Sequence, residues 1–270
     1  MSEKSQLISV VKEYPLPEGR MAFWWLGQLG YIIKMAGLTI YADPYLSESE
    51  DRLFAPPLRA DEIDNADIVL GSHDHIDHID DGAWKAIAKA SPEAVFVLPK
   101  LLAEKVSART GISTERMVGL DDGDCVKVKG VTIRAVASAH EFLDADPATG
   151  LHPYLGYVVE GGGRVFYHAG DTCLYEGLIT KLKKLATPDV MFVPINGRDA
   201  RRLKAGCIGN MTFQEAVDLC GQLSAKMAVP GHYDMFRDNL GSPLEFKAYL
   251  EVKYPQVKCW IGERGTVVEV

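Results

Sequence analysis

The stretch ADIVLGSHDHIDHID, residues 66–80, joins a short apolar run to a cluster of imidazole and carboxylate side chains. A short apolar run that ends in polar residues is typical of a buried strand presenting side chains at its end. The cluster contains His73, His75 and His78, three of the seven histidines in the 270-residue chain. Because histidine and aspartate are common ligands of divalent metals, this stretch predicts a metal site at the end of a buried strand.

The rest of the chain alternates strand and helix patterns without a linker or repeat that would divide it, so we expect one domain over residues 1–270. Thr212 and Glu215 form a capping-box pattern at the start of one helix. This order favours a layered α/β sandwich with helices outside two sheets. The patterns predict strands at 66–72, 94–99, 189–195 and 226–232, hairpins at 23–43, 126–138, 156–172 and 257–270, and helices at 82–90, 101–110, 175–186 and 212–225.

Other predicted strands also end in histidine or aspartate. Ligands in α/β folds gather at the carboxyl ends of strands, so we expect these side chains to meet the first cluster. His73 and His75 project the same way only if their strand continues through them, whereas Asp77 and His78 need the chain to turn. The additional candidates are His140, His168 with Asp171, and His232.

The pattern H-x-H-x-D-H at residues 73–78, followed by a distant histidine, a Gly-Asp pair and a last histidine, resembles the metallo-β-lactamase superfamily over nearly the whole chain. The resemblance implies a four-layer αβ/βα sandwich that holds two divalent metal ions per chain between its sheets. It also implies the ligand sets, which are His73, His75 and His140 for the first ion, Asp77, His78 and His232 for the second, and Asp171 as a bridge.

Four later segments are similar to the branch of this superfamily that contains L-ascorbate-6-phosphate lactonase: YHAGDT (167–172), NGR (196–198), NMTFQEA (210–216) and VPGHYDMF (229–236). The similarity implies a metal-dependent hydrolase that uses metal-activated water to open a lactone or related ester of a small anionic compound, such as a phosphorylated sugar. Asp77 is then a candidate proton shuttle. A ligand set of nitrogen and oxygen suits Zn²⁺, Mn²⁺ or Fe²⁺, and the branch favours Mn²⁺.

Two residues are candidates to support the metal ligands. Asp43 ends an early predicted strand and is expected either to orient a ligating imidazole or to serve as a turn residue before Pro44. His168 precedes Asp171 by three residues, and we favour hydrogen-bonding support over ligation for it.

Candidate substrate contacts lie near the predicted metal-bearing edge. Arg198 is the favoured anion contact in the basic loop at 196–204, because guanidinium binds phosphate and carboxylate in a bidentate manner. Asn196 belongs to the same motif. Tyr233 directly follows His232 and is expected either to bind a substrate oxygen or to pack.

Composition excludes several classes of partner. With 29 basic and 37 acidic residues the net charge is −8, which argues against a broad surface for nucleic acid or membranes. No segment approaches the roughly 20 apolar residues of a membrane span. The five scattered cysteines fit free thiols in a reducing compartment, so we expect a cytoplasmic protein. The expected partner is a small-molecule substrate. The sequence leaves a homo-oligomer open.

Three alternatives to the lactonase interpretation remain at this point. The first is a phosphodiesterase or nucleic-acid-processing hydrolase of the same superfamily, which the acidic net charge disfavours. The second is a redox di-iron protein, disfavoured because no flavin-binding domain is attached. The third is a metal-binding module without catalysis, which a metal with no exchangeable coordination position would support.

Overall fold

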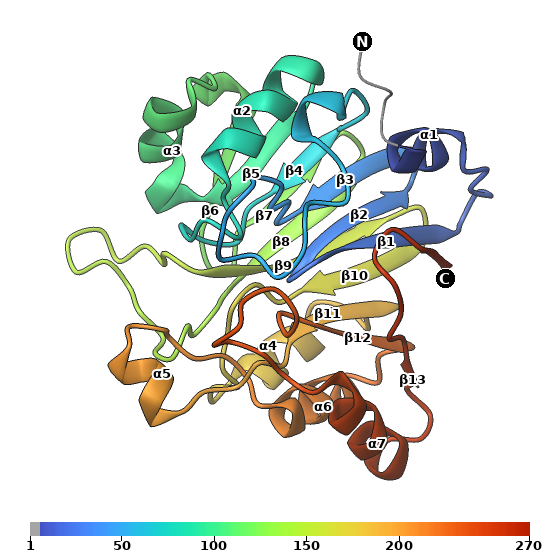
Figure 1. Ribbon diagram of the computed structural model, residues 1–270, viewed down its shortest axis with the longest axis vertical. Coiled ribbons are helices and arrows are strands. Elements are labelled where there is room, and N and C mark those ends of the chain that lie inside the picture. Colours follow the sequence, from blue (N-terminus) through green and yellow to red (C-terminus); the bar gives the residue numbers. More distant parts are fainter. Residues whose placement is uncertain (1–5) are drawn as a thin grey trace.

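The computed structural model describes residues 6–270, which form two seven-stranded sheets packed face to face with helices outside (Figure 1). The first sheet has the order β14-β1-β2-β3-β4-β5-β6 and the second β13-β12-β11-β10-β9-β8-β7. The first sheet contains β1 (Met21–Gly27), β2 (Gly30–Met35), β3 (Leu38–Ala42), β4 (Ile68–Leu70), β5 (Val95–Pro99), β6 (Met117–Leu120) and β14 (Val267–Glu269). The second contains β7 (Cys125–Val128), β8 (Val131–Ala137), β9 (Leu155–Gly161), β10 (Arg164–His168), β11 (Val190–Pro194), β12 (Met227–Gly231) and β13 (Lys258–Cys259).

The alternation of side chains along the strands builds three apolar layers. In β1, Phe23 and Trp25 point between the sheets, whereas Trp24 points to the outer face. Trp24 there shares a core with helices α1 (Gln6–Glu13), α2 (Asp81–Ala90) and α3 (Ala103–Thr110). The outer face of the second sheet packs against α4 (Leu178–Lys183), α6 (Phe213–Gln222) and α7 (Pro243–Lys253). The four-layer αβ/βα sandwich predicted from the sequence is confirmed.

The strands that precede the candidate ligands all run toward one edge of the sandwich. In the first sheet β3, β4, β5 and β6 are parallel, and in the second β10, β11, β12 and β13 are parallel. The side chains that follow β4, β8, β10 and β12 therefore meet at this edge. No helix within residues 6–270 is both long enough and apolar enough to cross a membrane.

Several predicted elements are correct and three need correction. The capping box at Thr212 and Glu215 is present at the start of α6. The predicted hairpin at 23–43 is instead three strands, because left-handed backbone at Gly27 (φ 97°) and Gln28 (φ 55°) reverses the chain inside a continuous apolar run.

The predicted C-terminal hairpin at 257–270 is also wrong. β13 pairs with β12 in the second sheet, whereas β14 pairs with β1 in the first. The segment between them crosses the side of the sandwich, where the ring centroids of Trp260 and Phe23 lie 5.3 Å apart. In the predicted loop at 196–204, Asp199 caps a short helix, α5 (Ala200–Lys204).

Candidate metal centre

Three groups of histidine and aspartate side chains at the shared sheet edge could hold metal ions. Within each group, the ligand atoms lie within 4.8 Å of one another. The groups are His73 with His75 and His140, His73 with His78 and Asp171, and Asp77 with His78 and His232. The structure thus brings together every residue expected to ligate metal, from four separate chain segments.

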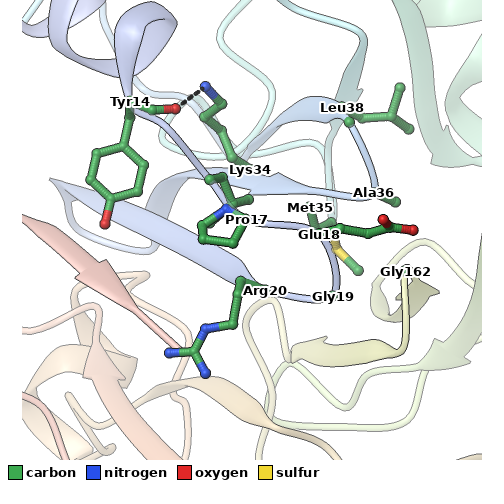
Figure 2. A pocket seen from close by; sticks show the side chains of 12 residues that line it. Tyr14, Pro17, Glu18, Gly19, Arg20, Lys34, Met35, Ala36, Leu38 and Gly162 are labelled. Atoms are coloured by element: carbon green, nitrogen blue, oxygen red, sulfur yellow. Dashed lines mark hydrogen bonds between the residues drawn. The ribbon is translucent and has the colours of Figure 1, made fainter.

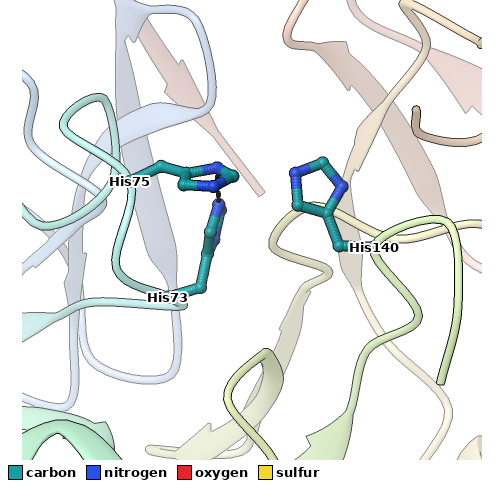
Figure 3. A group of neighbouring side chains, drawn as sticks. All are labelled: His73, His75 and His140. Atoms are coloured by element: carbon teal, nitrogen blue, oxygen red, sulfur yellow. Dashed lines mark hydrogen bonds between the residues drawn. The ribbon is translucent and has the colours of Figure 1, made fainter. Parts of the chain in front are cut away.

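The first group joins the turn after β4 to the segment after β8 (Figure 3). The strand does not continue through His73 and His75, because β4 ends at Leu70. A compact turn places the two rings instead, with His78 N and Ile79 N both donating to the carbonyl oxygen of His75. His73 Nε2 and His75 Nδ1 consequently lie 2.9 Å apart and face His140.

Asp171 lies between the two halves of the cluster. Its Oδ1 is 3.3 Å from His78 Nε2, and its Oδ2 is 3.1 Å from His232 Nε2 and 3.7 Å from His140 Nε2. Asp77 Oδ2 adds contacts of 3.4 Å to His78 Nε2 and 3.3 Å to His232 Nε2. We call the first and the third of the three groups the outer groups. The Asp171 carboxylate therefore contacts histidines of both outer groups.

The electrostatics of the cluster are those of buried charges that compensate each other. Burial opposes protonation of His232, but Asp171 and Asp77 outweigh it and raise its pKa to about 9. Burial likewise opposes ionisation of Asp171, but His232 and His78 hold its pKa well below the usual range. For His73, burial and the nearby His78 lower the pKa well below its ordinary value.

Asp43 fixes the orientation of His78 from behind. Its fully buried carboxylate accepts hydrogen bonds from His78 Nδ1 at 2.6 Å and from His168 Nε2 at 2.8 Å. The backbone N–H and hydroxyl of Ser72 also donate to it. Because His78 donates to Asp43 through Nδ1, Nε2 is the ring nitrogen that faces Asp77 and Asp171. His168 lies against Asp43 rather than in any of the three ligand groups.

The residues present fit a divalent metal. Within residues 6–270, the ion pairs of Asp43, Asp77 and Asp171 are all with histidines, so neither lysine nor arginine neutralises these carboxylates. His78 Nε2 and Asp171 Oδ1 are buried without hydrogen-bond partners among the described atoms. Buried nitrogen and oxygen atoms that converge on one point without hydrogen bonds are the ligand set that a cation requires.

Two aspartates of the stretch at residues 66–80, which we call the dense motif, take part in other interactions. Asp74 pairs with Lys105 and Arg109. Asp80 caps α2 by accepting from Ala83 N, and it also accepts from the hydroxyl of Ser47. Both carboxylates therefore support the surrounding structure, outside the three ligand groups.

The expected substrate contacts are engaged by protein partners. Arg198 donates to both carboxylate oxygens of Glu215, at 2.7 and 2.8 Å. Asn196 is buried, with its Nδ2 donating to Asn239 Oδ1 at 2.8 Å. The ring of half-buried Tyr233 packs 5.4 Å from that of Trp25. Their roles toward a substrate stay predictions.

Two residues near the ligands were missed by the sequence analysis. Gln28 Nε2 donates to Asp77 Oδ2 at 2.8 Å, and a lone polar residue between glycines in the run LGQLG was the available signal. The ring of Tyr154 lies 5.3 Å from that of His140 and 5.4 Å from that of His73, a position that nothing in its local sequence indicates. His152, two residues before Tyr154, lies outside the three ligand groups and pairs with Asp121.

Two hollows differ in their relation to the metal centre. One of 630 Å³ is lined by Tyr14, residues 16–20 and 34–38, and Gly162, and contains no candidate ligand (Figure 2). Lys34 in this hollow donates to the carbonyl oxygen of Tyr14, the residue that follows the C-terminal end of α1. The other, of 510 Å³, lies between loops that follow β3, β11 and β12. No candidate ligand lines the second hollow either, but of these two hollows it is the one formed by segments from the edge that carries the ligands.

A two-sheet sandwich with buried imidazole and carboxylate groups gathered at one edge is an arrangement suited to metal-dependent hydrolysis. The chain belongs to the beta-lactamase superfamily, whose domain model matches residues 39–233. It is 30% identical to a UPF0173 metal-dependent hydrolase of Myxococcus xanthus, over 92% of this chain and 82% of that protein. It is 26% identical to a UPF0173 metal-dependent hydrolase of Caldivirga maquilingensis, over 91% of this chain and 96% of that protein.

The solved structures give the same fold. Igni18, a metallo hydrolase from Ignicoccus hospitalis, superposes with a TM-score of 0.71 at 23% identity, covering 93% of this chain and 98% of that one. The family model and the relatives confirm the superfamily and the metal-dependent hydrolase class expected from the sequence.

Proposed function

We propose that the chain opens a lactone or a related ester of a small anionic compound, such as a phosphorylated sugar, as in the L-ascorbate-6-phosphate lactonase branch. The observation that carries the proposal is the buried set of histidines and aspartates, with Asp171 in contact with both outer groups. The acidic net charge of −8 favours a small molecule over nucleic acid as the substrate.

In this proposal His73, His75 and His140 hold one ion, Asp77, His78 and His232 hold a second, and Asp171 binds both. Bound Mn²⁺ or Zn²⁺ would lower the pKa of water toward neutrality and polarise the carbonyl oxygen that is attacked. Asp43 and Ser72 hold the turn after β4 in the conformation that presents these side chains.

Asp77 is the proposed proton carrier. Its side chain is 11% exposed, against 3% for Asp171 and 0% for Asp43, so it is the carboxylate of the cluster most open to a bound substrate. Water oxygen bonds to the acyl carbon, and the ester C–O bond breaks. The proton that the water loses passes to the Asp77 carboxylate and then to the leaving oxygen.

The 510 Å³ hollow supports an anionic, hydroxylated substrate. Arg52, Arg202 and Arg237 line it, as do the carboxylates of Glu50, Asp51 and Asp238. Guanidinium groups suit phosphate or carboxylate, while carboxylates accept hydrogen bonds from sugar hydroxyls. Arg202 Nη1 also donates to the carbonyl oxygen of Asn196, which ties the hollow to the 196–210 segment beside His140.

The test is elemental analysis of the purified protein, followed by assays with the identified metal restored. The panel contains sugar lactones with and without a phosphate group, phosphomonoesters and phosphodiesters. We expect hydrolysis of lactones, with the phosphorylated member preferred. Activity confined to phosphodiesters would overturn the proposed substrate class, and a metal-loaded protein with no turnover of any ester would overturn the proposed reaction.

A further inference from the structure

Gln28 lies in the turn between β1 and β2, next to the group of candidate ligands formed by Asp77, His78 and His232. Its backbone is held from three sides, since its N–H donates to Asp234 Oδ1 and its carbonyl oxygen accepts from Trp25 Nε1 and His232 N. Its φ of 55° is in the left-handed region that few residues other than glycine adopt. The side chain is 1% exposed, so its position is set by these contacts.

The side-chain amide of Gln28 faces ligand atoms on two sides. Its Nε2 lies 2.8 Å from Asp77 Oδ2 and 3.0 Å from His232 Nε2. These two atoms lie 3.3 Å from each other and belong to the group formed by Asp77, His78 and His232. The amide oxygen, Gln28 Oε1, is buried and has no hydrogen-bond partner within residues 6–270.

A buried amide with an unpartnered oxygen is costly unless something satisfies that oxygen. Rotation of the amide by 180° exchanges its nitrogen and oxygen while the carbon positions stay the same. In the rotated form Oε1 faces Asp77 Oδ2 and His232 Nε2, an arrangement that repels the Asp77 carboxylate but suits a cation held by all three side chains. An amide oxygen is a neutral, hard ligand of the kind that divalent ions accept beside carboxylates.

We infer that Gln28 is an additional metal ligand, binding through Oε1 the ion held by Asp77, His78 and His232. Without metal, the same amide donates to Asp77 Oδ2 and keeps that carboxylate in place. The inference rests on the proposed ligand sets and adds to them a residue from a fifth segment of the chain.

The experiment compares wild type with Gln28→Met and Gln28→Glu, which are close in size. Apo protein is titrated with Mn²⁺ and Zn²⁺ by calorimetry, and bound metal is counted by elemental analysis. Gln28→Met should weaken the second equivalent at least tenfold and leave the first unchanged. Gln28→Glu should bind the second ion as tightly as wild type or more tightly, because a carboxylate oxygen replaces the amide oxygen.

The glutamate variant separates ligation from support by hydrogen bonding. If Gln28 only donated to Asp77, Gln28→Glu would place two carboxylates together and bind the second ion more weakly than Gln28→Met. That result would overturn the inference. So would unchanged binding of both equivalents by Gln28→Met.

Two controls complete the experiment. Gln256→Glu adds the same charge at an exposed position and should bind both ions like wild type. Circular dichroism checks that the variants are folded, and a metal-dependent rise in Tm of Gln28→Glu larger than that of wild type is a second readout. A wild-type protein that binds one equivalent would overturn the two-ion site and this inference together, whereas failure of the lactone assays alone would leave the binding result standing.

Discussion

Oδ2 of Asp43 lies 2.6 Å from Nδ1 of His78, and both side chains are fully buried. The contact fixes which ring nitrogen of His78 carries the proton and which is free to bind a metal. It also links β3 to the turn after β4, the turn in which the dense motif lies. Asp43 thereby determines the ligand geometry without belonging to a ligand group itself.

Replacing Asp43 by asparagine should lower metal affinity 10- to 100-fold, the range typical for groups that orient a ligating histidine. The amide keeps an acceptor for Ser72 but loses the charge that stabilises the His78 N–H. Metal content after dialysis against a metal buffer measures the effect. Asp80→Asn is the matched control, since Asp80 caps α2 outside the three ligand groups, asparagine is an equally good N-cap, and metal content should stay unchanged. Equal metal content in both variants would contradict the role of Asp43.

Replacing Asp171 by alanine should abolish both metal retention and turnover, because its carboxylate contacts histidines from both outer groups. Elemental analysis and the ester assays give the two readouts. Asp74→Ala removes a carboxylate from the dense motif that pairs with Lys105 and Arg109, so it should keep its metal. A fully active Asp171→Ala with normal metal content would exclude a bridging role.

Arg237→Gln should raise KM for an anionic substrate about tenfold with little change in kcat, as expected when an interaction is equally strong in the ground and transition states. Arg237 lines the 510 Å³ hollow and is exposed, so its removal should leave the fold intact. Steady-state kinetics with the phosphorylated and the unphosphorylated lactone would measure the change. Arg59 is exposed and does not line this hollow, and Arg59→Gln should behave like wild type. The same KM for Arg237→Gln and wild type would remove Arg237 from the site.

Asp189 provides a pH-dependent contribution to stability. Burial opposes its ionisation, but Lys226, Val165 N and Arg164 outweigh burial and lower its pKa. A carboxyl with a depressed pKa in the folded state stabilises the fold above its unfolded pKa of about 3.9, and this stabilisation is lost as pH falls through the folded value. Asp189→Asn should cost about 2 kcal/mol at pH 7, in the range for hydrogen bonds to a charged group.

Urea unfolding at pH 7 and near pH 3 tests the sign of this effect. The difference between wild type and Asp189→Asn should shrink as the pH falls, because protonation removes the same charge from wild type. Asp124→Asn, at an exposed turn position, is the control. A difference that stays constant over this pH range would show that the charge of Asp189 does not stabilise the fold.

Local sequence predicted the elements whose pattern does not depend on distant partners. The strands near β5, β8, β11 and β12 and the helix that Thr212 caps were recognisable from apolar runs and capping chemistry. Strand pairing was not, because the residues at 257–270 read equally well as a hairpin or as edges of two different sheets. Only long-range packing around Trp260 distinguishes these possibilities.

The candidate site followed from residue type and position more than from local conformation. Histidine and aspartate at strand ends were enough to select the side chains that the structure brings together. The orientation of each ring was not predictable, because it depends on partners such as Asp43 and the carbonyl oxygen of Gly209, which lie far away in the chain. Gln28 was not predicted because its contact with Asp77, 49 residues away in the sequence, forms only in the folded chain.

The left-handed backbone at Gln28, Asp43 and His232 has a consequence for how this protein can change. Each conformation disfavours an ordinary side chain by about 1 kcal/mol, and glycine would relieve it. A glycine at any of these positions would relax the backbone but would delete a group from the ligand cluster or its immediate support. The backbone cost and the buried hydrogen bonds are therefore inseparable at these three positions, so the left-handed conformation persists as long as the side chains that it places at the ligand cluster do.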